Sequence, residues 1–120
     1  MSAPAWIAVG LLGGLAAAAR LLLDAEVAAI SRTRFPLGIL AVNLLGSLAL
    51  GIVAGAGLDG EALVIVAGGG IGSFTTFSTW VLDSHRLERA GQLDLALLNI
   101  GVSLVAGFAA VALGHWLGSL

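Results

Sequence analysis

A glycine cluster followed at once by hydroxyl and aromatic side chains occupies residues 68–80, inside a long apolar run. Glycine weakens a helix, and interrupted backbone persists in lipid only where protein or water covers it. The carbonyls freed at such an interruption can hold a cation. The segment therefore predicts a pore or a binding site for something small and polar, built where a helix breaks at about residues 68–75.

Four hydroxyl side chains fall within five positions after the glycines, at Thr75, Thr76, Ser78 and Thr79. On a helix Thr75 and Thr79 share a face, and Thr76 lies close to Thr79. Serine and threonine in membrane helices often bond only their own backbone. Four of them around a helix break nevertheless exceed what packing requires, which favours a polar lining.

Phe74, Phe77 and Trp80 are spaced by three residues in the same segment. This spacing fits an ordinary lipid or packing face. It also fits an aromatic lining that contacts an anion, because the edge of an aromatic ring is positive and can receive an anion while excluding water.

Two further polar residues lie in apolar surroundings. Asn43 is midway along another apolar run, where its amide either bonds a neighbouring helix or donates an N–H to an anion. The nearby hydroxyl motif favours the second interpretation. Arg20 lies near the end of the first apolar run, where we favour snorkelling or a structural role over an electrostatic role at an anion vestibule.

The elements that position these residues are predicted to be membrane-spanning helices. The 120-residue chain is 59% hydrophobic and only 10% charged, which is typical of an integral membrane protein. Four runs approach the ~20 residues that cross a bilayer: 5–23, 36–58, 62–82 and 93–118. They lack the alternation of an outer-membrane barrel, so the fold class is all-α. The N-terminus has no basic stretch, so the first run is predicted to be a retained span.

Charge placement narrows the function. All seven acidic residues lie at helix ends or in loops, which argues against a proton-coupled exporter that needs an acid within the membrane. No basic stripe for nucleic acid is present, and cysteine chemistry is excluded because the chain has no cysteine. The five arginines fall near the loops after the first and third runs, so the positive-inside rule places both termini on the extracytoplasmic side.

Small residues recur at four-residue spacing, a pattern that lets helix backbones approach closely in lipid. The pairs are Gly10/Gly14, Gly51/Gly55, Gly68/Gly72 and Ser103/Gly107. They fit packing within one chain or an interface between subunits. Four short helices can hardly enclose a pore alone, which favours an oligomer.

Together these motifs resemble the Fluc (CrcB) family of fluoride channels. The resemblance is carried by Gly13-Gly14 with Arg20, by Asn43-x-x-Gly46-Ser47, and by Gly72-x-x-Thr75-Thr76-Phe77-Ser78-Thr79, in that order along the whole chain. It implies a four-helix subunit with a broken third helix and an antiparallel, dual-topology dimer. It also implies two fluoride pores and a central structural sodium ion held by backbone carbonyls.

The resemblance also assigns roles to single residues. It implies a fluoride pore lined by Asn43, Thr76, Phe77, Ser78, Thr79, Trp80 and Ser103, sodium-binding carbonyls on Gly72 and Thr75, and a vestibule or structural role for Arg20. Trp80 stands where the family has a second pore phenylalanine, and Asn99 where it often has tyrosine. Ile39 and Gly107 replace hydroxyl residues and thin the polar path.

The sequence thus predicts a subunit of a bacterial inner-membrane channel that passively exports toxic fluoride and is not an enzyme. Its partner is a second subunit inserted in the opposite orientation. This subunit is either another copy of this chain or a homologue whose charge distribution favours the opposite orientation, which we call an oppositely biased homologue. The arginine asymmetry leads to the hypothesis that such a homologue is required. The alternatives are a small multidrug-type secondary transporter and a non-conducting partner or assembly subunit.

Overall fold

The computed structural model describes residues 1–120, all of them in helices or short connections. Four segments are long and apolar enough to cross a membrane, which confirms the predicted all-α, four-span fold. The first, second and fourth are α1 (Ala3–Ser31), α2 (Leu37–Gly55) and α6 (Leu93–Gly118). The third is composite: α3 (Gly60–Leu63), the π-helix η1 (Val64–Ile71), α4 (Gly72–Phe74) and α5 (Ser78–Arg89).

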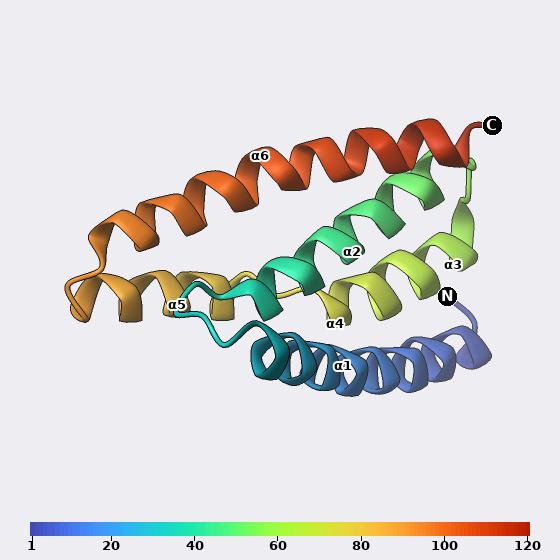
Figure 1. Ribbon diagram of the computed structural model, residues 1–120. Coiled ribbons are helices and arrows are strands. Elements are labelled where there is room, and N and C mark those ends of the chain that lie inside the picture. Colours follow the sequence, from blue (N-terminus) through green and yellow to red (C-terminus); the bar gives the residue numbers. More distant parts are fainter.

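The two ends of the helix bundle differ in charge. The N-terminus, the C-terminus and the turn between α2 and α3 lie together at one end (Figure 1). The loops at 32–36 and 90–92 lie at the other end, and four of the five arginines are in or next to them. The structure therefore brings the arginine-free segments to one end, as the even number of spans predicts.

Two helices extend beyond their apolar runs, whereas α6 has the predicted bounds and α2 ends at Gly55, before the predicted end at residue 58. α1 continues from residue 23, the predicted end, to Ser31, and α5 continues from residue 82 to Arg89. The added turns contain good helix formers such as alanine, leucine, arginine and glutamate, so the end of the apolar run is not the end of the helix. Arg20 consequently lies inside α1, about three turns before its last residue, and not near its end.

The third segment is interrupted at Thr75–Phe77, later than the predicted break at 68–75. The glycines of the cluster stay helical, three of them in the wider π-helix and Gly72 in α4, and Gly69 and Gly70 pack closely against α1. A Cβ on Gly69 would lie 3.1 Å from the Val9 Cα atom, and one on Gly13 would lie 3.0 Å from Ser73 Oγ. The chain leaves helical geometry at Thr75, which is extended with ψ 159°.

Glycines also bring α2 and α6 into backbone contact. A Cβ on Gly51 would lie 2.8 Å from the His115 nitrogen, and one on Gly114 would lie 2.9 Å from the Ile52 nitrogen. The Gly51/Gly55 pair thus serves packing within the chain. Gly10 and Gly14, by contrast, meet no atom within 4 Å and face away from the bundle.

We predict that Gly51→Ala lowers the free energy of unfolding by about 1–3 kcal/mol, because the new methyl group meets backbone that cannot move aside. Gly101→Ala on α6 is the matched control, since nothing lies within 4 Å of its Cβ position. The control should be neutral or stabilising by up to about 1 kcal/mol. Thermal unfolding in detergent measures both, and equal midpoints for the two variants would contradict this account of the packing.

Candidate functional site

The side-chain amide of Asn43 holds the interruption of the third segment in place. Its Nδ2 donates to the Thr76 carbonyl at 2.9 Å, and its Oδ1 accepts the Thr76 backbone N–H at 2.8 Å. One amide on α2 therefore satisfies both backbone groups of the residue at the centre of the interruption. A second Nδ2 hydrogen is left for another acceptor.

The two hydrogen bonds between Asn43 and Thr76, which we call the clamp, take hydrogen-bond donors away from the preceding helix. In a continuous helix the Thr76 N–H would bond the Gly72 carbonyl, and the Thr79 N–H would bond the Thr75 carbonyl. Here Thr76 donates to Asn43, and the Thr79 N–H donates to Thr76 Oγ1 at 3.2 Å. The two carbonyls predicted to bind sodium thus lose their helical donors at the interruption, as does the Ser73 carbonyl between them, since the Phe77 N–H forms no backbone hydrogen bond.

The four hydroxyls divide into two groups. Thr75 Oγ1 donates to the Ile71 carbonyl at 3.0 Å, which is the ordinary bond of a threonine to its own helix. Thr76 Oγ1 is buried and donates to Thr79 Oγ1 at 3.2 Å, with Ser78 Oγ 3.4 Å away. The predicted cluster therefore exists around Thr76 and caps the start of α5.

The aromatic pair beside the clamp differs in exposure. Phe77 is 73% exposed, whereas Trp80 is half-buried. Their rings meet edge to face, with centroids 5.3 Å apart and planes at 64°, the geometry that aromatic quadrupoles favour. Phe74, the first member of the predicted stripe, precedes the interruption and lies near Gly46.

These residues border a hollow of about 280 Å³, which we call the hydroxyl hollow. It is lined by Asn43, Gly46, Ser47, Leu50, Ile71, Thr75, Thr76, Phe77, Trp80, Ser103 and Leu104. Ser103 Oγ is buried there without a hydrogen-bond partner. A buried hydroxyl with no partner is costly, so its position in the hollow suits a polar ligand.

The structure brings together most, but not all, of the predicted pore residues. Asn43, Thr76, Phe77, Trp80 and Ser103 line the hydroxyl hollow, whereas Ser78 and Thr79 do not. Sequence reasoning gave Ser47 no role of its own, although it lies four residues after Asn43 and therefore on the same face of α2.

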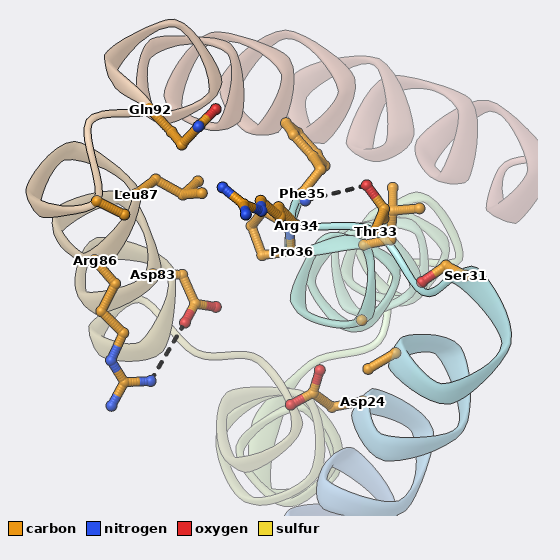
Figure 2. A pocket seen from close by; sticks show the side chains of 14 residues that line it. Asp24, Ser31, Thr33, Arg34, Phe35, Pro36, Asp83, Arg86, Leu87 and Gln92 are labelled. Atoms are coloured by element: carbon orange, nitrogen blue, oxygen red, sulfur yellow. Dashed lines mark hydrogen bonds and ion pairs between the residues drawn. The ribbon is translucent and has the colours of Figure 1, made fainter.

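A second hollow, of about 560 Å³, lies at the arginine-rich end of the bundle. Figure 2 shows it bordered by Asp24 of α1, by Arg34 in the loop before α2, and by Asp83 and Arg86 of α5. Asp83 and Arg86 approach within 3.9 Å. Arg20 lines neither hollow and forms no ion pair.

No three His, Cys, Asp or Glu side chains lie close enough together to hold a metal ion. The carbonyls of Gly72 and Thr75, for which the resemblance implies sodium binding, are among those that lose their helical donors at the interruption.

The chain is similar along most of its length to one family of membrane proteins. Residues 7–115 match the family model described as CrcB-like protein, Camphor Resistance (CrcB). A relative in Mycobacterium tuberculosis (strain H37Rv), named "Fluoride-specific ion channel FluC 2", is 41% identical over 96% of this chain and 91% of its own length. In Symbiobacterium thermophilum, "Fluoride-specific ion channel FluC 2" is 46% identical over 86% of this chain and 88% of its own. "Fluoride-specific ion channel FluC 1" of the same organism is 40% identical over 94% and 96%.

Proposed function

The chain belongs to the CrcB family, whose curated relatives are named fluoride-specific ion channels, and from this premise we propose that it lets fluoride leave the cell passively across the bacterial inner membrane. The family is one of channels and not of enzymes. The chain's four apolar spans make it a multi-pass membrane protein.

The observation that carries the proposal is the hydroxyl hollow itself. Fluoride must exchange a tightly held water shell for protein groups, and conduction needs several moderate sites instead of one deep site. The hollow offers the remaining Nδ2 hydrogen of Asn43, the unpartnered Ser103 hydroxyl and the ring edges of Phe77 and Trp80. These groups donate hydrogen bonds or present positive ring edges, and none of them carries a full charge that would trap the anion.

The proposed cation site uses the carbonyls of Gly72 and Thr75. Carbonyl oxygens at broken helices suit sodium, and both carbonyls lose their helical donors at the interruption. When bound, sodium would neutralise these carbonyl dipoles. Two oxygens are fewer than a sodium ion needs, so we propose that a second chain supplies further ligands.

Replacing sodium with N-methylglucamine during purification and reconstitution is expected to lower the unfolding temperature and to suppress fluoride flux, because sodium stabilises the state that binds it. Restoring sodium should reverse both effects. Flux and unfolding temperature that do not depend on sodium concentration would contradict the cation site.

Exposure of the interruption supports an oligomer. Gly72, Phe77 and Ser78 are exposed although they lie midway along a membrane span, and irregular backbone is not stable against lipid. We propose that a second, antiparallel subunit covers this face and completes two pores. The arginine asymmetry favours insertion with the termini outside, so the second subunit is either a minority of this chain inserted the opposite way or an oppositely biased homologue.

Fluoride efflux from liposomes that contain only this chain, with sodium present, tests the proposed function. Rapid efflux of fluoride, with none from chloride-loaded liposomes, is expected if the chain pairs with itself. If folded protein gives no efflux, co-expression with an oppositely biased homologue should restore it. Absence of efflux in both experiments would contradict the channel and favour a non-transporting subunit.

A further inference from the structure

Trp80 is tied to α6 through one buried residue, Asn99. The indole Nε1–H donates to the Asn99 backbone carbonyl at 3.3 Å. The Asn99 side-chain Nδ2 donates to Ser84 Oγ at 2.8 Å, and Ser84 Oγ donates to the Trp80 carbonyl at 3.0 Å. The three residues form a closed ring of hydrogen bonds, which we call the indole lock.

Two members of the indole lock are buried. Asn99 is 1% exposed and Ser84 is 7% exposed, so water does not compete for the bond between their side chains, and Trp80 is half-buried beside them. Trp80 and Ser84 are four residues apart and share one face of α5. Asn99 thus contacts α5 at two points one turn apart, which fixes the rotation of α5 beside the hydroxyl hollow.

The indole N–H of Trp80 is directed to α6. Because Nε1 donates to α6, tryptophan adds no free donor to the hollow and presents its ring there. That ring packs edge to face on Phe77, the exposed aromatic residue at the mouth of the hollow. The orientation of both rings therefore depends on the lock.

We propose that Asn99 and Ser84 are positioning residues for the aromatic pair, and that Trp80 meets the permeating anion through its ring edge and not through its N–H. This inference rests on the proposed fluoride function of the hollow. Neither residue lines the hollow, so both act through Trp80.

The first test needs no variant. Hydrogen exchange of the three indole N–H groups, measured by NMR on the ¹⁵N-tryptophan-labelled protein, should be at least about tenfold slower for Trp80 than for Trp6 and Trp116, because an N–H held in a hydrogen bond exchanges only when that bond opens. Trp6 and Trp116 are 64% and 59% exposed. Equal exchange at all three indoles would overturn the lock.

The second test is a cycle of variants. Ser84→Ala/Asn99→Leu removes both polar side chains together, so that neither is left buried and unpaired, and keeps the Asn99 backbone carbonyl that accepts the indole N–H. Without the side-chain bond between α5 and α6 that carbonyl no longer lies at a fixed place beside Trp80, so fluoride efflux is expected to fall about tenfold while the protein stays folded. Trp80→Phe removes the indole donor and one of the two fused rings, and keeps an aromatic ring edge at this position. Adding Ser84→Ala/Asn99→Leu to Trp80→Phe should then change efflux less than about twofold.

The outcomes distinguish the positioning role of Asn99 and Ser84 from the proposed channel function. The same tenfold loss in the tryptophan and phenylalanine backgrounds would mean that Asn99 and Ser84 act on packing generally, and would overturn the inference while leaving the channel intact. Unchanged efflux in the tryptophan background would overturn it too. A parent protein without fluoride efflux, alone or with a homologue, would overturn the proposed function and this inference with it.

Discussion

Phe77→Ala is expected to reduce fluoride flux by about 30- to 100-fold while leaving the free energy of unfolding within about 0.5 kcal/mol of the parent. The flux falls because the ring edge that replaces water around the anion is lost, an effect of about 2–3 kcal/mol at the barrier. Stability is spared because the side chain is 73% exposed in the single chain and contributes little to its core.

Phe108→Ala is the matched control for this prediction. Phe108 is 76% exposed, carries the same side chain and lies on α6 outside the hydroxyl hollow. It should conduct at the parent rate. Flux from liposomes and thermal unfolding should be measured on the same preparations. Equal flux from the two variants would remove Phe77 from the pore.

Asn43→Ala should impair both folding and flux, in contrast to Phe77→Ala. It removes both partners of the Thr76 peptide, and leaving buried polar groups without partners costs about 1–3 kcal/mol for each. Part of this cost is recovered if the Thr76 N–H returns to the Gly72 carbonyl and closes the helix. We therefore expect flux to fall at least about 100-fold and the sodium dependence of the unfolding temperature to disappear.

Asn43→Asp tests whether the hydrogen bonds of the clamp are required, as opposed to the size of the side chain alone. Aspartate has nearly the same shape and keeps an oxygen for the Thr76 N–H, but its second oxygen faces the Thr76 carbonyl and its charge repels fluoride. It should fail to conduct as well. Parent-like flux and sodium dependence in either variant would show that the clamp does not hold the conducting state.

The helices of this protein could be predicted from the sequence because solid apolar runs of about 20 residues leave few alternatives in a membrane. The bounds of α6 were predicted correctly, but the end of α1 was not, because residues 24–31 are polar enough to leave the membrane yet still favour a helix. The glycine content led to a predicted interruption that is too early. Gly69 and Gly70 contact α1, and the interruption follows at Thr75–Phe77, where Asn43 replaces the helical acceptor.

The candidate site was predictable in its residue types but not in its connections. Asn43 and the hydroxyls were expected near each other, yet the amide is used mainly to hold Thr76. Trp80 was expected in place of a second pore phenylalanine, and its additional N–H donates to Asn99, which lies 19 residues further along the chain. Such pairings depend on how α5 packs against α6, and local spacing within either helix contains no signal for them.

The most direct test of the proposed function is the reversal potential of the current through this protein, with its homologue if one is required, in a planar bilayer that separates fluoride from chloride at equal pH. A passive fluoride channel predicts a reversal potential that follows the fluoride gradient when fluoride is varied and does not move when chloride or pH is varied. A potential that follows the proton gradient, or one that shifts equally with chloride, would contradict the account.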